Sequence, residues 1–190
     1  MNLIAEYPPV FQFFERHRLL VTAAPADLLD VVTLEGTVED PWVSRAIRLR
    51  ELPGRLLASM GHGNRFRNRA AFGLRDFTLL GRDSDREIAF GLTGKFWQMD
   101  YGLVSIHGPD EFEAFGAIGV PRLALIFSAE LADEGHVWLS TETRIFCNDR
   151  RPYWCFLPYW WIIRLASGLM RRRLLLRIRN AAERARVVVN

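Results

Sequence analysis

Hydrophobic and polar residues alternate along five stretches of the chain, with the period of two that is typical of β-strands. These stretches span about residues 13–23, 77–81, 86–93, 122–132 and 136–148. Arg82-Asp83-Ser84-Asp85 and Asp133-Glu134-Gly135 are polar turn sequences between neighbouring stretches, and they predict hairpins. The pattern therefore predicts a run of antiparallel strands, with one strand far ahead of the others in the chain.

Two short helices are predicted after the first strand. The first begins at Pro25, carries Asp27 near the positive end of its dipole, and ends near Gly36. The second begins at Asp40-Pro41 and is stopped by Pro53-Gly54. Residues 59–73 contain three Gly and two Asn, so an irregular loop is expected there.

The C-terminal part has the period of a helix rather than of a strand. Apolar or small residues recur at spacings of three or four over about thirty residues, which places them on one helix face. They are Phe156, Trp160, Ile163, Ser167, Met170, Leu174, Ile178, Ala181 and Ala185. Arg172, Arg179, Glu183 and Arg186 fall on the opposite side. The whole order of elements predicts an α+β fold that ends in one long helix.

Composition agrees with an ordinary globular protein forming one domain over residues 1–190. Hydrophobic residues make up 49% of the chain and charged residues 25%, which is enough apolar material for a sizeable core. The net charge of +3 is uneven, because the segment from Arg164 onward carries eight Arg and a single acidic residue, Glu183. The basic character therefore belongs to the last helix.

Several kinds of site and location are disfavoured by the residues that the chain contains. Cys147 and Cys155 have no further Cys or His at ligand spacing, so we expect free thiols in a reducing cytoplasm and no metal. There is no phosphate-binding glycine motif, so we expect no cofactor. The N-terminus lacks the apolar run of a signal peptide. Residues 153–163 carry no charge, but the run is too short to span a bilayer; peripheral membrane contact is compatible with it.

The order of elements, with several local stretches, resembles the helix-grip fold of the START-like (SRPBCC) superfamily, in an uncharacterised bacterial branch. These stretches are Glu15-Arg16-His17, Ala23-Ala24-Pro25, Leu49-Arg50-Glu51-Leu52-Pro53, Gly91-Leu92-Thr93-Gly94-Lys95-Phe96-Trp97, Thr141-Glu142-Thr143-Arg144, Tyr159-Trp160 and Ser167-Gly168. The resemblance implies a curved antiparallel sheet wrapped around the long C-terminal helix, with an apolar cavity between them. Members of the superfamily include lipid carriers, polyketide cyclases and subunits that modify aromatic rings, so the fold alone does not choose a function.

Four polar residues are candidates for the site in such a cavity. Glu15 and His17 lie two apart on the first strand, and Glu142 and Arg144 lie two apart on the last. The first and last strands are neighbours in the helix-grip topology, so the four residues are expected in one polar cluster. The alternative is a cross-strand ladder of salt bridges on the solvent face. The sequence leaves the face of the last strand open, because apolar residues alternate with this pair.

An aromatic group is the second candidate, either as the lining of a ligand cavity or as plain core. Its members are Phe90, Phe96, Trp97, Tyr159 and Trp160.

Three functions follow from the polar and aromatic candidates and from the basic helix. The first is binding of a small hydrophobic molecule. The second is a cyclase or dehydratase, with His17 or Glu142 as the acid–base group and Arg144 polarising a carbonyl. The third is contact of the Arg-rich helix with an anionic membrane or partner; nothing resembles a nucleic-acid motif.

Overall fold

The computed structural model describes residues 3, 7–33, 45, 72–98 and 100–189, except for the side chains of residues 165–167 and 185–189. The predicted helix from Asp40 to Pro53 and most of the predicted loop over residues 59–73 lie outside the described residues.

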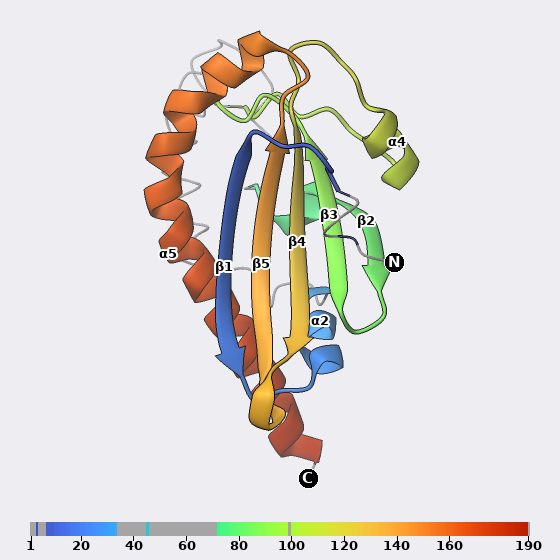
Figure 1. The fold of residues 1–190 in the computed structure, drawn as a ribbon, viewed down its shortest axis with the longest axis vertical. Coiled ribbons are helices and arrows are strands. Elements are labelled where there is room, and N and C mark those ends of the chain that lie inside the picture. Colours follow the sequence, from blue (N-terminus) through green and yellow to red (C-terminus); the bar gives the residue numbers. More distant parts are fainter. Residues whose placement is uncertain (1–2, 4–6, 34–44, 46–71, 99, 190) are drawn as a thin grey trace.

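The strands form one antiparallel sheet in the order β1-β5-β4-β3-β2 (Figure 1). They are β1 (Phe13–Val21), β2 (Thr78–Asp83), β3 (Glu87–Thr93), β4 (Arg122–Leu131) and β5 (Val137–Phe146). Each lies within two residues of a stretch predicted from alternation. The first strand of the chain pairs with the last, Phe13 opposite Ile145 and Val21 opposite Val137.

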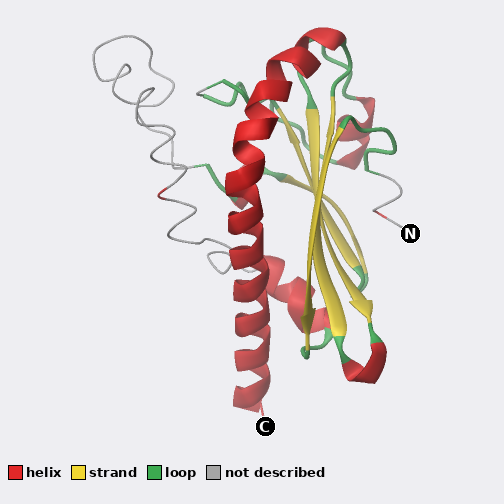
Figure 2. Cartoon of the chain, turned by 60° about the vertical axis from the view of Figure 1, so that its left-hand side comes forward, coloured by secondary structure: helices red, strands yellow, loops and turns green. Residues whose placement is uncertain are grey.

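Helices lie on both sides of this sheet (Figure 2). α5 (Arg150–Val189) runs along one side with Pro158 inside it, and α2 (Pro25–Thr33) packs against its C-terminal half. The short α4 (Pro109–Ala114) lies on the other side and has a single buried residue, Phe112. We call the sheet face toward α5 the inner face and the opposite one the outer face.

The inner face carries two apolar clusters that lie at opposite ends of the strands. The lower cluster joins the sheet to α2 and to the second half of α5, with Leu28, Leu29, Phe90, Phe127, Leu139, Leu175, Ile178 and Ala182 among its members. The upper cluster joins the sheet to the first half of α5, through Phe13, Leu92, Phe96, Ile145, Cys147, Phe156 and Trp160. The side chain of Ile178 is fully buried, and that of Phe156 is 2% exposed, so α5 is anchored at both ends.

The outer face has a third cluster, which covers β2, β3 and β4. Its members are Leu3, Tyr7, Leu80, Ala89, Ile106, Phe112, Ala124 and Ile126. A Cβ atom at Gly91 would approach Leu80 and Phe112 to 2.8 Å, so these side chains pack directly on the backbone of β3. The result is an α+β fold with a five-stranded antiparallel sheet and a long C-terminal helix, an arrangement compatible with the predicted helix grip.

Candidate functional site

Glu15 and His17 lie on the inner face, between the upper and lower clusters. The Nε2 atom of His17 lies 2.7 Å from Oε1 of Glu15, and the Glu15 side chain is only 7% exposed. Arg171, from α5, places its Nε 3.9 Å from the other oxygen of Glu15. Its Nη1 donates a hydrogen bond of 3.1 Å to Oγ1 of Thr141, the residue opposite His17 in β5. We call Glu15, His17, Thr141 and Arg171 the inner polar group.

Gly168 places the backbone of α5 beside this group, with room for a small side chain. A Cβ atom at Gly168 would lie 3.6 Å from Cε1 of His17 and 4.0 Å from Oε1 of Glu15. Burial lowers the pKa of Arg171 to about 10, and the nearby carboxylate of Glu15 opposes that shift. The sequence prediction placed Arg171 within a solvated basic segment, whereas its side chain lies between helix and sheet.

Thr143 extends the inner polar group along β5. It lies opposite Glu15 in the register of β1 and β5, and its side chain is 3% exposed. Its hydroxyl has no hydrogen-bond partner among the described residues, which is uncommon for a buried polar atom. The inner face therefore carries a buried polar band between two apolar clusters.

Glu142 and Arg144 lie on the outer face, so the prediction of one four-residue cluster is wrong. The register places Glu142 opposite Arg16 and Arg144 opposite Phe14, whereas Glu15 lies opposite Thr143. Neighbouring residues of a strand point to opposite faces, so the backbone of the sheet separates the two pairs. His17 and Arg144 therefore cannot act on the same substrate atom, which corrects the predicted catalytic arrangement for His17. The alternative acid–base group, Glu142, lies on the same face as Arg144 and is paired with it.

The outer pair belongs to a cross-strand ladder of charges, the alternative predicted from the sequence. The Nε atom of Arg144 donates to Oε1 of Glu142 at 2.6 Å, and both side chains are nearly buried. Arg16 of β1 lies 3.8 Å from Glu142 and also 3.8 Å from Glu130 of β4. The guanidinium of Arg144 lies 4.7 Å from the ring of Phe11, which covers it. This ladder joins three strands, and its residues do not line the pocket described below.

The aromatic candidates form packed core. The ring of Phe156 lies 5.8 Å from Trp160, 5.5 Å from Tyr159 and 6.5 Å from Trp97. Phe90 belongs to the lower cluster, where its ring meets Phe127 at 6.3 Å. The structure thus brings Trp97, Tyr159 and Trp160 together around Phe156 and leaves Phe90 apart. Their close packing fits the core alternative rather than the lining of a cavity.

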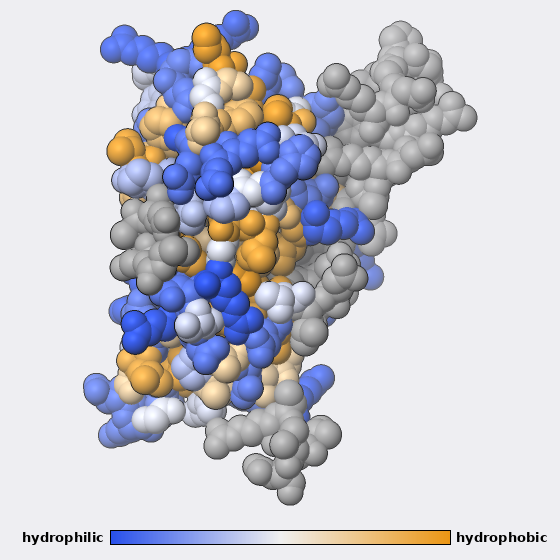
Figure 3. All heavy atoms as spheres, turned by 90° about the vertical axis from the view of Figure 1, so that its right-hand side faces the viewer, coloured by the Kyte–Doolittle hydropathy of each residue, from blue (hydrophilic) through white to orange (hydrophobic). Residues whose placement is uncertain are grey.

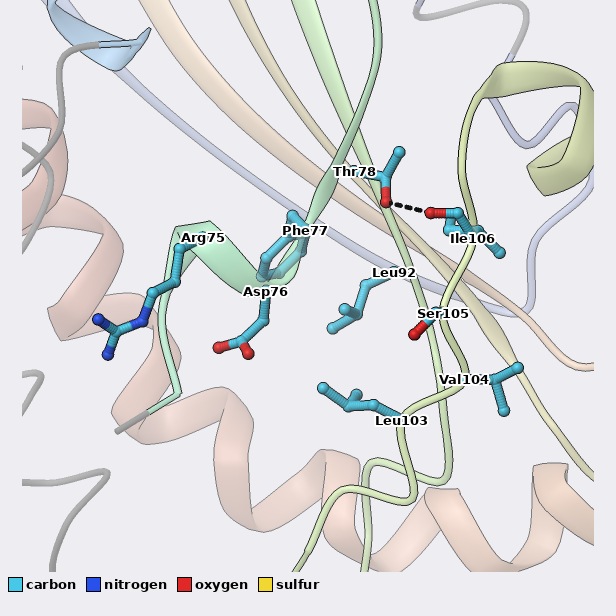
Figure 4. A pocket seen from close by; sticks show the side chains of 9 residues that line it. All are labelled: Arg75, Asp76, Phe77, Thr78, Leu92, Leu103, Val104, Ser105 and Ile106. Carbon is cyan, nitrogen blue, oxygen red and sulfur yellow. Dashed lines mark hydrogen bonds between the residues drawn. The ribbon is translucent and has the colours of Figure 1, made fainter. Parts of the chain in front are cut away.

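A pocket of about 410 Å³ lies beside the upper cluster, where the edge of β3 extends beyond the start of β2 (Figure 4). Val104 forms a bridge to Thr93 at the end of β3, and Oγ1 of Thr78 donates 2.8 Å to the carbonyl oxygen of Ile106. These contacts frame the space from two sides. The lining residues are Arg75, Asp76, Phe77, Thr78, Leu92, Leu103, Val104, Ser105 and Ile106.

The lining of the pocket mixes apolar and polar groups, and the polar groups contribute the larger share of its surface. Leu92 and Leu103 point into the space, the carboxylate of Asp76 and the hydroxyl of Ser105 point toward them, and Arg75 extends away (Figure 4). One oxygen of Asp76 accepts a hydrogen bond of 2.8 Å from the backbone of Gly73. Figure 3 views the molecule from the β2 and α4 side and shows hydrophobic surface in the middle of that face, between hydrophilic regions.

None of the sequence candidates lines this pocket. Its residues come from a 3₁₀ turn (Leu74–Asp76), the start of β2, the end of β3 and an irregular segment after residue 100. These parts have no shared motif, and only the tertiary fold brings them together.

Three further expectations concern metal ligands, membrane-spanning helices and the two thiols. No group of three or more His, Cys, Asp or Glu residues in the described ranges could hold a metal ion. Within the same ranges, no helix is both long enough and apolar enough to cross a membrane. Both cysteines are free, Cys147 buried and Cys155 exposed. Burial raises the pKa of the Cys147 thiol to about 12, with a smaller contribution from the carboxylate of Asp149.

Comparison with protein-family models, with curated proteins and with solved structures gave no significant match. The resemblance to the START-like superfamily therefore stays a prediction from the sequence. What the structure establishes is the coarser statement, an α+β arrangement of five antiparallel strands and a C-terminal helix.

Proposed function

We propose that the protein binds a small, largely hydrophobic molecule in the pocket beside the upper cluster. The pocket itself is the observation that supports this. Its volume of about 410 Å³ lies within the usual range for sites of small molecules, roughly 300–1,000 Å³. The expected ligand class is the one that the sequence predicted, but the proposed position differs, because rings fill the space around Trp160.

The lining residues indicate which chemistry such a molecule would need. Leu92, Leu103 and Phe77 offer an apolar surface against which a hydrocarbon chain or an aromatic ring would lose water. Asp76 is a hydrogen-bond acceptor when ionised, and the hydroxyl of Ser105 can donate or accept. The ligand should therefore have an apolar body and at least one donor group, such as a hydroxyl or an amine.

The experiment fills the pocket and measures binding. N-phenyl-1-naphthylamine, an uncharged apolar fluorophore, is titrated into the protein, and native mass spectrometry tests whether a small molecule is retained from the expression host. Leu103→Trp places a large ring in the space and should reduce probe binding at least about tenfold. Ile118→Trp adds the same ring at a position that is 88% exposed and should leave binding unchanged.

Two results would contradict the proposal. One is wild-type protein that neither retains a molecule nor binds the probe. The other is probe binding that Leu103→Trp leaves as strong as in the Ile118→Trp control, since the binding site would then lie elsewhere. Circular dichroism of each variant confirms that the fold is kept.

A further inference from the structure

The first half of α5 exposes large apolar side chains on the side away from the sheet. Trp154 is 64% exposed, Trp161 63%, Ile162 74% and Leu169 70%. At about 100° per residue they fall within an arc of about 100°, together with the exposed Pro158. We call these five residues the outer strip of α5.

The outer strip plays no part in the described core. The residues that anchor α5 to the sheet are Phe156 and Trp160 in its first half and Leu175, Ile178 and Ala182 in its second half. They occupy the other side of the helix. Isolated exposed apolar residues are normal, but large side chains gathered on one helix face commonly mark an interaction surface.

The charge around the outer strip selects the kind of partner. The helix contains no acidic residue before Glu183, and Arg150, Arg151, Arg164, Arg172 and Arg173 are all exposed. The guanidinium of Arg164 lies 5.9 Å from the ring centre of Trp161, so one cation borders the strip directly. Among the described residues of α5, the charges beside this apolar strip are positive, which is complementary to a surface that is apolar inside and anionic outside.

We propose that the outer strip of α5 docks the protein on an anionic lipid bilayer, with the helix lying in the plane of the interface. Trp is favoured at the boundary between headgroups and hydrocarbon, and Ile and Leu partition below it. The flanking Arg side chains are long enough to reach lipid phosphates while their stems stay in apolar surroundings. A second copy of the chain is a poorer partner, because it would bring an equally positive helix.

The proposed membrane contact lies in the first half of α5 rather than in the second half. The sequence prediction assigned anionic contact to the Arg-rich second half. There, however, Arg171 turns inward to Glu15, and Arg179 lies 3.8 Å from Glu183. The first half carries the exposed apolar area together with three exposed Arg and no acidic residue of its own, so it is the part that suits a membrane.

Vesicles test the proposal with the whole chain of residues 1–190. Sedimentation with phosphatidylcholine vesicles containing 30% phosphatidylglycerol should carry the protein down at low salt, and vesicles of phosphatidylcholine alone should carry much less. Binding should weaken steeply with added salt. A fluorophore on Cys155, the exposed thiol beside the strip, should shift to shorter wavelength only with the anionic vesicles.

Substitutions separate the apolar contribution from the charge. Trp154→Ala with Trp161→Ala and Leu169→Ala should weaken binding by about tenfold per side chain, and Arg164→Gln or Arg172→Gln by about fivefold each. The matched control, Val10→Ala with Ile118→Ala and Leu131→Ala, removes exposed apolar residues elsewhere and should bind as wild type does. All these side chains are mainly exposed, so the variants should fold.

Three outcomes would overturn the proposal. The first is the absence of binding to either vesicle at low salt. The second is an equal effect of the strip variant and its control. The third is a concentration-dependent dimer in sedimentation velocity that the strip variant dissociates, since the strip would then be covered by a second copy. Each outcome leaves the pocket proposal untouched, because probe binding is measured without vesicles.

Discussion

The two halves of α5 both pack against the sheet, but with different residues. In the first half, Phe156 and Trp160 face the sheet and large apolar side chains also face outward. In the second half, Leu175, Ile178 and Ala182 face the sheet and Arg residues face outward. Arg171 lies at the junction and turns toward Glu15. The first half therefore combines the larger buried side chains with the more hydrophobic surface, and a sequence stripe alone does not distinguish these two roles.

The largest expected effect concerns the anchors. Phe156→Ala should lower the free energy of unfolding by about 4 kcal/mol, because removing this buried ring leaves a cavity among the rings that surround it. Leu175→Ala in the second half should cost about 3 kcal/mol. Urea unfolding measures both values. A smaller loss for Phe156→Ala than for Leu175→Ala would reverse the comparison.

The junction should show the next largest effect. Arg171→Met removes the helix cation that faces the buried carboxylate of Glu15, and about 3 kcal/mol of stability should be lost. Arg172→Met makes the same change at the next residue, which is exposed, and should stay within about 0.5 kcal/mol of wild type.

A second substitution checks the cause of that loss. Adding Glu15→Gln to Arg171→Met removes the carboxylate left without its cation, and it should restore part of the lost stability. Equal unfolding midpoints for Arg171→Met and Arg172→Met would show that the inner polar group does not stabilise the packing of α5 against the sheet.

The two cysteines lie near the start of α5 and differ in burial. The titration of the buried one should give the smallest effect on stability. The unfolded thiol of Cys147 loses its proton near its ordinary pKa of 9, whereas in the fold that pKa is about 12. Between these values the unfolded state binds fewer protons than the folded state, so stability falls as pH rises. The loss should be about 1 kcal/mol from pH 9 to pH 10, because the unfolded thiol is already half deprotonated at pH 9.

The Cys147→Ala variant provides the control, because it should lack this part of the pH dependence. In native wild-type protein at pH 8, a thiol reagent should modify one cysteine quickly, Cys155, and the second only after unfolding. Rapid modification of both thiols would mean that the upper cluster opens readily.

The sequence predicted the strands well because alternation and turn residues are local signals. Both hairpin turns appeared where Arg82-Asp83-Ser84-Asp85 and Asp133-Glu134-Gly135 predicted them. α4 escaped prediction because a helix of six residues with one buried side chain has no period to detect. The long helix was found, since its apolar stripe runs for many turns.

The site was harder to predict for three physical reasons. Both faces of β5 are buried, so burial does not identify the inner one. The apolar residues Val137, Leu139 and Ile145 lie on the inner face and were the signal that could have identified it. An apolar stripe shifted by one residue along α5 fits the helical period of 3.6 almost as well. The sequence pattern therefore did not show that Arg171 faces the sheet. The pocket depends on where β2 begins relative to β3, and no local pattern determines that.

The pairing of β1 with β5 has a consequence for how the chain reaches its fold. Residue 13 lies opposite residue 145, so a ribosome must synthesise nearly all of the described chain before this ladder can form. Until then, β1 is without its partner strand, and its central run of Glu, Arg, His and Arg resists pairing with other chains, as charged strand edges do. The same residues that divide between the two faces of the finished sheet would therefore protect the nascent chain from aggregation while its first strand waits for its partner.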